Sequence, residues 1–143
     1  MRSNAILLVE DNPDDIELTK RAFAKAKIQN ELIIARDGQQ AIDLLFRDDN
    51  VQPIRPVVTL LDLSLPKIGG LEVLSRIRKD NRTKHLPVVV LTSSNESADL
   101  FQSYDLGVNS YIRKPVEFNQ FVEAVSTLQL YWIILNEPPP EAE

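Results

Sequence analysis

Polar residues that can carry chemistry follow four separate apolar runs of the sequence. In chain order they are Glu10, Asp11, Asp62, Thr92 and Lys114. Carboxylate oxygens are ligands that Mg²⁺ prefers, and a carboxylate can also act as a nucleophile toward phosphorus. If the fold brings these residues together, their types indicate a Mg²⁺-dependent transfer of a phosphoryl group to a carboxylate.

Each of these groups has a physical reason to be present in such a reaction. Carboxylates packed together repel one another, which raises at least one pKa unless a cation is bound. Mg²⁺ would relieve this repulsion and let Asp62 attack phosphorus. The loose transition state of phosphoryl transfer mainly needs positioning and positive charge. Lys114 and Mg²⁺ would supply the charge, and the Thr92 hydroxyl would donate a hydrogen bond to a phosphoryl oxygen.

An alternation of apolar runs and amphipathic segments must position these side chains. The runs, which we expect to be strands, lie at residues 5–9, 32–35, 57–61, 88–91 and 110–112. Segments with helical periodicity lie at residues 14–27, 39–47, 71–79, 95–106 and 117–135. This strict alternation is typical of an α/β domain with a parallel sheet. Ligands of such a sheet bind at the carboxyl ends of its strands, where the polar residues fall.

Composition and charge narrow the class of protein. The 143 residues suit one domain, and the formal net charge of −5 argues against nonspecific nucleic-acid binding, which depends on basic residues. The chain has no cysteine and one histidine, His85, so a disulfide framework and a histidine-rich metal site are excluded. We find no apolar run that could cross a membrane and no signal peptide, and a cytoplasmic protein is expected.

Four short motifs resemble the receiver domains of two-component response regulators. They are Val9-Glu10-Asp11-Asn12, Leu60-Leu61-Asp62-Leu63, Leu91-Thr92-Ser93 and Lys114-Pro115. The match covers essentially the whole chain in the expected order. The resemblance implies a flavodoxin-like, three-layer fold with a five-stranded parallel sheet of order 2-1-3-4-5. It places the receiver domain at residues 1–137 and leaves residues 138–143 as a tail that we predict to be disordered.

The resemblance implies a phosphoacceptor and a set of metal ligands. It makes Asp62 the phosphoacceptor and Asp11 a direct ligand of Mg²⁺. Glu10 would be the second acidic residue and act through water. The backbone carbonyl of Ser64 would complete the ligands that the protein supplies.

The resemblance also implies a switch. Thr92 and Lys114 would hold the phosphoryl group, and Tyr111 would be an aromatic residue that turns inward after Thr92 moves toward the phosphate. This movement would remodel the face formed by the last two helices and the last strand. The peptide bond between Lys114 and Pro115 would be cis.

More narrowly, the chain resembles the small stand-alone response regulators of cyanobacterial and bacterial phytochromes. The features that carry this resemblance are Asp11-Asn12-Pro13-Asp14-Asp15, the proline-bearing loop before the third strand, Thr92-Ser93-Ser94-Asn95 and the Tyr131-Trp132…Asn136-Glu137-Pro138 ending. It implies a histidine kinase as partner, specifically a phytochrome kinase, and a downstream protein that the sequence does not identify. Neither nucleic acid nor a membrane is expected as a partner.

Acidic residues after the first run allow two interpretations. Asp14, Asp15 and Glu17 are either extra metal ligands or members of a first helical turn, where the helix dipole favours negative charge. Because Pro13 and Asp14 are typical start signals of a helix, the helical interpretation is favoured.

The last predicted helix has more apolar residues than one buried face needs. One face at helical spacing carries Phe118, Phe121, Val122, Val125, Leu128 and Trp132. The six consecutive apolar residues 130–135 wrap around the helix, so Leu130, Tyr131 and Ile134 must point away from the sheet. An exposed apolar patch of this kind more often marks an interface. We therefore predict a homodimer through this helix. The alternative is a helix that ends earlier, with these residues folded back onto the domain.

Three other functions would use similar residues. A haloacid-dehalogenase-type phosphatase needs an acid two residues after its nucleophile, and because that residue is Ser64, we do not expect an enzyme. A flavodoxin-like FMN carrier is disfavoured because the acidic residues after the first strand would repel a phosphate. A receiver-like binding module that is not phosphorylated is expected to lack Asp62, Asp11 or Lys114, and all of these are present.

Overall fold

The computed structural model describes residues 4–47, 52–94, 96–114 and 117–129, and strands and helices alternate strictly along them. The strands are β1 (Ile6–Val9), β2 (Leu32–Ala35), β3 (Val58–Leu61), β4 (Val88–Thr92) and β5 (Ser110–Arg113). The helices are α1 (Pro13–Lys25), α2 (Gly38–Phe46), α3 (Gly70–Lys79), α4 (Ser97–Asp105) and α5 (Phe118–Leu128). Each element expected from the sequence is confirmed, with small differences at the ends. Residues 130–135 of the last predicted helix lie outside the described residues.

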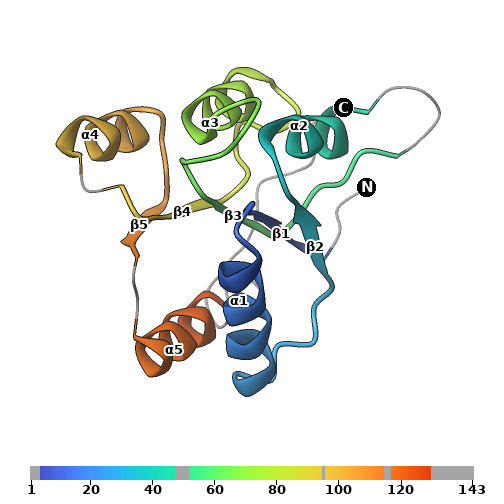
Figure 1. The fold of residues 1–143 in the computed structure, drawn as a ribbon. Helices are drawn as coiled ribbons and strands as arrows, with labels where there is room; N and C mark the ends of the chain where they lie inside the picture. Colours follow the sequence, from blue (N-terminus) through green and yellow to red (C-terminus); the bar gives the residue numbers. More distant parts are fainter. Residues whose placement is uncertain (1–3, 48–51, 95, 115–116, 130–143) are drawn as a thin grey trace.

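The strands form one parallel sheet of order β2-β1-β3-β4-β5. Helices α1 and α5 cover one face of this sheet, and α2, α3 and α4 cover the other (Figure 1). All residues of β1, β3 and β4 are buried, as expected for central strands covered on both faces. The predicted flavodoxin-like, three-layer fold is therefore confirmed.

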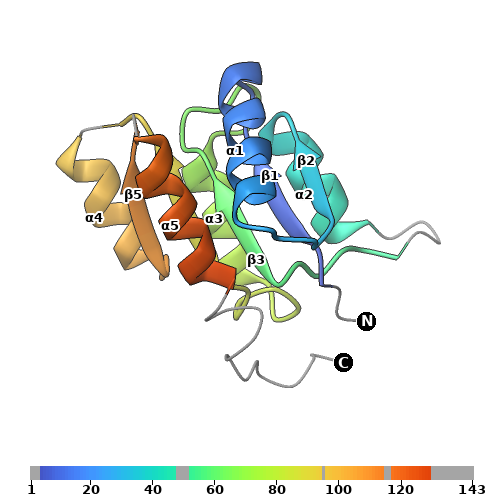
Figure 2. The same cartoon turned by 90° about the horizontal axis from the view of Figure 1, so that it is seen from below.

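Each face of the sheet builds its own apolar cluster, because successive residues of a strand point to opposite faces. Leu7 and Val9 of β1 belong to the cluster under α2 and α3, whereas Ile6 and Leu8 belong to the cluster under α1 and α5. Figure 2 shows α1 and α5 side by side, and both helices contribute residues to the second cluster. No described helix combines the length and the apolar character needed to span a bilayer.

On α5, the predicted buried face is confirmed where the structure describes it. Phe121 and Val125 are buried, and Phe118 and Val122 pack against the same cluster. The Leu128 side chain and Trp132, which were predicted to continue this face, lie outside the described part of the chain.

The register of the sheet brings the ends of its central strands to one level. Val9 at the end of β1 is paired with Leu61 at the end of β3, so the next residues, Glu10 and Asp62, are neighbours. At this level the strand order also reverses, because β2 and β3 lie on opposite sides of β1. Such a reversal point is where open α/β sheets bind their ligands.

Candidate functional site

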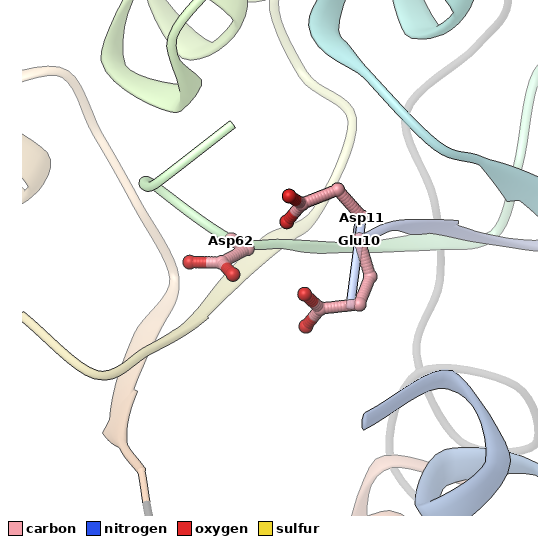
Figure 3. A group of neighbouring side chains, drawn as sticks. All are labelled: Glu10, Asp11 and Asp62. Atoms are coloured by element: carbon pink, nitrogen blue, oxygen red, sulfur yellow. The ribbon is translucent and has the colours of Figure 1, made fainter. Parts of the chain in front are cut away.

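Three carboxylates gather at the carboxyl ends of β1 and β3. Glu10, Asp11 and Asp62 each offer a carboxylate oxygen, and these oxygens all lie within 4.8 Å of one another (Figure 3). Glu10 and Asp62 are buried, whereas Asp11 is exposed. The cluster therefore has a buried interior and one open side.

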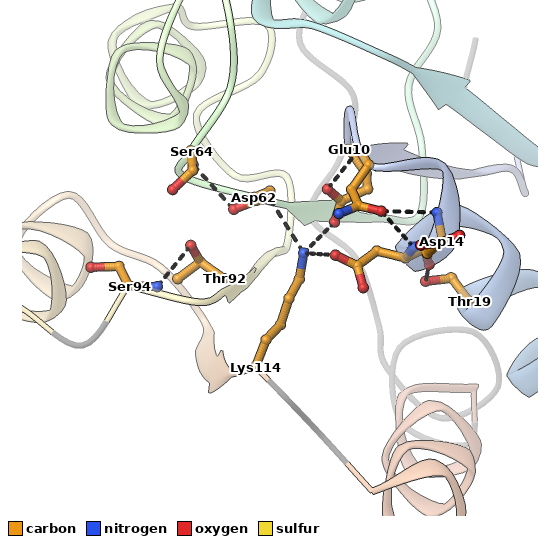
Figure 4. Close-up of polar contacts among 10 residues, drawn as sticks. Glu10, Asp14, Thr19, Asp62, Ser64, Thr92, Ser94 and Lys114 are labelled. Atoms are coloured by element: carbon orange, nitrogen blue, oxygen red, sulfur yellow. Dashed lines mark hydrogen bonds and ion pairs between the residues drawn. The ribbon is translucent and has the colours of Figure 1, made fainter.

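Lys114 lies among these carboxylates. Its Nζ donates hydrogen bonds to Glu10 Oε1 at 2.6 Å and to Asp62 Oδ2 at 3.3 Å (Figure 4). The Lys114 backbone N–H donates to the Thr92 carbonyl at 2.7 Å, which continues the pairing of β4 and β5 beyond the last strand residue. The sheet itself therefore directs this ammonium group toward the acidic cluster.

The pKa values of the two buried carboxyl groups are shifted in opposite directions. Burial raises the pKa of Glu10 to about 7, although Lys114 opposes the shift. Burial acts in the same direction on Asp62, but the Ser64 N–H and the Lys114 charge, together with the side chains of Thr92 and Glu10, outweigh it and hold the pKa of Asp62 below its usual range. Near neutral pH, Asp62 is therefore ionised, as a carboxylate nucleophile must be, whereas Glu10 is only partly ionised.

Lys114 stays charged in this position. Burial disfavours the ammonium form, but hydrogen bonds to Asp15 and Glu10 and the charge of Asp62 raise the pKa of Lys114 above its ordinary value. A permanent positive charge thus lies 3.3 Å from Asp62 Oδ2.

Two further residues contact Asp62. The Ser64 backbone N–H donates to Asp62 Oδ1 at 3.1 Å, and Ser64 lines the cleft beside it. Thr92 is fully buried at the end of β4, and its hydroxyl helps to lower the pKa of Asp62. Ligation of a metal by the Ser64 carbonyl stays a prediction.

The cluster opens into a cleft at the carboxyl ends of the strands. The cleft has a volume of about 630 Å³ and is lined by Asp11, Asn12, Pro13, Asp15, Asp62, Ser64, Ser93 and Lys114. Because Asp62 lines this cleft, its carboxylate can be reached from solvent although the residue is largely buried.

The acidic cluster fits a hard divalent cation. Its donors are all oxygens, and opposite ligands of an octahedral Mg²⁺ lie roughly 4.2 Å apart, since each bond is about 2.1 Å. The three carboxylate oxygens lie within 4.8 Å of one another, which is close to that value, so the cluster has the donor type and the approximate size that such an ion needs. Lys114 balances part of the negative charge of the same cluster.

The structure confirms the helical interpretation of the acidic residues after β1. The Asn12 side chain caps α1 by accepting the N–H groups of Asp14 at 2.9 Å and Asp15 at 3.3 Å. Glu17 pairs with Arg21 on the exposed side of the helix.

Asp15 has a second contact that the sequence analysis missed. Its Oδ2 accepts a hydrogen bond from Lys114 Nζ at 2.8 Å, so it belongs to the site as well as to the helix. The available signal was topological: α1 begins where β1 ends, so its first turn lies at the same edge of the sheet.

Tyr111 lies apart from the cleft. It is a half-buried residue of β5 that packs against the cluster under α2 and α3. Its hydroxyl is buried and has no hydrogen-bond partner in the described part of the chain. The predicted switch role is not tested by this position, and the predicted cis bond before Pro115 lies outside the described residues.

Replacing Tyr111 by phenylalanine is expected to stabilise the protein. A buried polar group without a partner costs about 1–3 kcal/mol, and this substitution removes the hydroxyl but keeps the ring. We expect the free energy of unfolding to rise by about 1 kcal/mol in urea denaturation. A loss of stability would mean that the hydroxyl has a favourable partner.

Replacing Gly70 by alanine is expected to disturb the backbone that carries Asp62. A Cβ on Gly70 would lie 2.3 Å from the Asp62 carbonyl oxygen and 2.5 Å from Leu63 Cα. We expect a loss of about 1–3 kcal/mol of stability in urea denaturation, as for other overpacked sites. Gly69→Ala is the matched control, because a Cβ there meets nothing within 4 Å. Equal effects of both substitutions would contradict the close approach.

Comparison with protein families gives one match over most of the chain. The family model described as response regulator receiver domain matches residues 6–126. Among curated proteins, the probable methanogenesis regulatory protein FilR2 of Methanothrix harundinacea is 40% identical over 137 residues, which is 96% of this chain and 88% of FilR2.

Several solved structures are similar over nearly the whole chain. The phosphorylated cyanobacterial phytochrome response regulator RcpA is 38% identical with a TM-score of 0.82, covering 98% of this chain and 100% of RcpA. The Mn²⁺-bound form of response regulator Rcp1 is 37% identical with a TM-score of 0.81, covering 96% and 99%. The bacteriophytochrome response regulator RtBRR is 50% identical with a TM-score of 0.75, covering 98% and 86%.

Proposed function

Because the chain belongs to the response regulator receiver domain family, we propose that it is a phosphorylation switch that accepts a phosphoryl group on Asp62. The observation that carries the proposal is the position of an ionised Asp62 in an open cleft, between two other carboxylates and the Lys114 ammonium group. The similarity to a phosphorylated response regulator, RcpA, supports the same chemistry.

In the proposed reaction, an oxygen of Asp62 forms a bond to phosphorus while the bond between phosphorus and the donor histidine nitrogen breaks. The leaving nitrogen keeps the electron pair of the broken bond. Lys114 offsets the charge on the phosphoryl oxygens, and the Thr92 hydroxyl donates a hydrogen bond to one of them.

Glu10, Asp11, Asp62 and the Ser64 carbonyl are the groups that would hold a divalent cation, which we propose to be Mg²⁺. Bound there, the ion would neutralise charge shared between Asp62 and the incoming phosphate. The acidic cluster and the similarity to the Mn²⁺-bound form of Rcp1 support this assignment.

The geometry favours a phosphoacceptor over a phosphatase. An aspartate-nucleophile phosphatase needs an acid two residues after the nucleophile to protonate the leaving group. In this chain that residue is Ser64, whose backbone N–H donates to Asp62. We therefore propose no turnover of phosphate monoesters.

The proposed partner is a histidine kinase of the phytochrome class. The similarity to RcpA and RtBRR, which are described as phytochrome and bacteriophytochrome response regulators, supports it. We also propose a homodimer through the apolar residues 130–135. Sedimentation that shows only monomer at micromolar concentration, with and without phosphorylation, would exclude the dimer.

The proposal is tested by incubating the protein with acetyl phosphate and Mg²⁺ and measuring its intact mass. We expect a gain of one phosphoryl group that requires Mg²⁺, is absent in Asp62→Asn and is unchanged in Asp105→Asn, which alters an exposed acid of α4. Paramagnetic resonance of added Mn²⁺ measures metal binding separately. If no phosphodonor gives a mass gain, the chain is instead a receiver-like binding module.

A further inference from the structure

Ser94 holds the first turn of α4 to the end of β4. Its hydroxyl donates to Asp99 Oδ2 at 2.6 Å and accepts the N–H of Glu96 at 3.3 Å. Glu96 is the N-cap residue of α4, but its own side chain makes no capping hydrogen bond. Ser94 therefore contacts both the backbone of the N-cap residue and a side chain in the first turn of α4.

The backbone of Ser94 contacts the proposed phosphoryl site. Its N–H donates to Thr92 Oγ1 at 3.3 Å (Figure 4), and the Thr92 hydroxyl in turn interacts with Asp62. A hydroxyl that accepts one hydrogen bond still has its proton to donate. The Thr92 proton can therefore be directed at Asp62, or at an oxygen bound to it, while Ser94 holds the hydroxyl oxygen. Polar contacts through Thr92 and Ser94 thus connect Asp62 with α4.

Helix α4 has few buried contacts of its own. Ser103 is its single buried residue, whereas α3 buries four. The side chains of Phe101 and Tyr104 are 73% and 54% exposed. Elements with little buried apolar area open at a low cost in free energy. The two hydrogen bonds of Ser94 are therefore among the contacts that hold the first turn of this helix in place.

We propose that Ser94 and Asp99 are positioning residues that couple the Thr92 hydroxyl to α4. When Thr92 donates a hydrogen bond to a phosphoryl group, the hydrogen bond between the Ser94 N–H and Thr92 Oγ1 changes in strength. Because the Ser94 hydroxyl also donates to Asp99, the position of the first turn of α4 changes with it. This inference rests on the proposed function, because the phosphoryl group on Asp62 is what engages Thr92.

The resting protein provides the first test, by hydrogen exchange and mass spectrometry of peptides from α4. Ser94→Ala and Asp99→Ala remove the hydrogen bond to a carboxylate, and we expect the amides of α4 to exchange about tenfold faster. Ser94→Thr, which keeps the hydroxyl, is expected to restore slow exchange. Ser97→Ala, in the same helical turn, is the control and is expected to leave exchange unchanged. Unchanged exchange in both alanine variants would overturn the proposal.

The phosphorylated protein provides the second test, with acetyl phosphate and Mg²⁺ as the probe and intact mass as the measure of phosphorylation. In the unaltered chain, phosphorylation is expected to change the exchange of α4. In Ser94→Ala and Asp99→Ala, the phosphoryl group is still gained, but the change in α4 is expected to shrink at least about threefold. A full response of α4 in these phosphorylated variants would overturn the coupling.

The two tests also separate this inference from the proposed function. If the unaltered chain gains no phosphoryl group, the proposed function fails and the coupling fails with it. The exchange of the resting protein still shows in that case whether the pair anchors α4, because that measurement does not depend on phosphorylation.

Discussion

Replacing Lys114 by alanine is expected to slow phosphorylation of Asp62 by acetyl phosphate at least about 100-fold, the usual effect of removing one preorganised donor from a transition state. Lys114 Nζ lies 3.3 Å from Asp62 Oδ2 and has no substitute among the described residues, because the other charged side chains at the cleft are carboxylates. Intact mass measured as a function of time gives the rate.

The same substitution is expected to change metal affinity in the opposite direction. Lys114 balances the negative charge of Glu10 and Asp62, so its removal increases the attraction of the cluster for a divalent cation. Mn²⁺ should bind more tightly to the variant, as measured by paramagnetic resonance, although phosphoryl transfer is slower. A general loss of structure would weaken both properties, so the opposite directions distinguish the two explanations.

The Lys114→Ala substitution is also expected to lower the free energy of unfolding. Without metal, removing one partner of a buried ion pair typically costs about 3–5 kcal/mol, and a bound cation should restore much of that loss. Lys20→Ala, an exposed lysine of α1, is the control and should change neither rate nor stability. A normal phosphorylation rate in Lys114→Ala would show that the ammonium group does not stabilise the transition state.

The alternation of apolar and amphipathic segments was sufficient to predict the architecture. β1, β3 and β4 are almost wholly apolar because both faces of the sheet are covered, and strands of that kind are hard to confuse with amphipathic helices. The strand order came from the resemblance to a family, since pairing depends on contacts between distant segments that periodicity does not specify.

For the site, the sequence indicated which strand ends place reactive side chains at one edge of the sheet. It did not indicate which of these side chains contact one another. Glu10 and Asp62 could be placed side by side because both follow buried strands. The topology could place Asp15 at the same edge of the sheet, but it could not predict the contact with Lys114, which depends on how α1 is rotated about its axis. The close approach of Gly70 to the Asp62 backbone was also invisible, because glycines in turns are common for many reasons.

Replacing Glu10 by glutamine is expected to remove a pH dependence of stability from the metal-free protein. The pKa of Glu10 is about 7 in the folded chain, compared with an ordinary value of 4.5. Between these values the folded protein keeps a proton that the unfolded chain releases, so the free energy of unfolding falls as pH rises. The slope is about 1.4 kcal/mol per pH unit, which amounts to about 3 kcal/mol over the whole window.

Other groups of the site do not produce this slope. The pKa of Asp62 is lowered, so Asp62 contributes stability that is lost only as pH falls through the acid range below its ordinary value of 3.8. The pKa of Lys114 is raised, and its titration lies on the alkaline side. All the proteins that are compared carry His85→Gln, so that titration of the single histidine does not contribute to the measured slope. Glu123→Gln, which alters an exposed acid of α5, is the matched control and should leave the slope intact.

Urea denaturation in the presence of EDTA, at pH 5.5 and at pH 8, provides the measurement. We expect the protein with an intact Glu10 to lose about 2 kcal/mol between these conditions, and the Glu10→Gln protein to lose almost nothing. Added Mg²⁺ should reduce the slope, because a cation binds the deprotonated cluster and stabilises the folded state more at high pH. Equal stability of the parent protein at both pH values would mean that Glu10 is ionised throughout, and that Lys114 alone compensates for its burial.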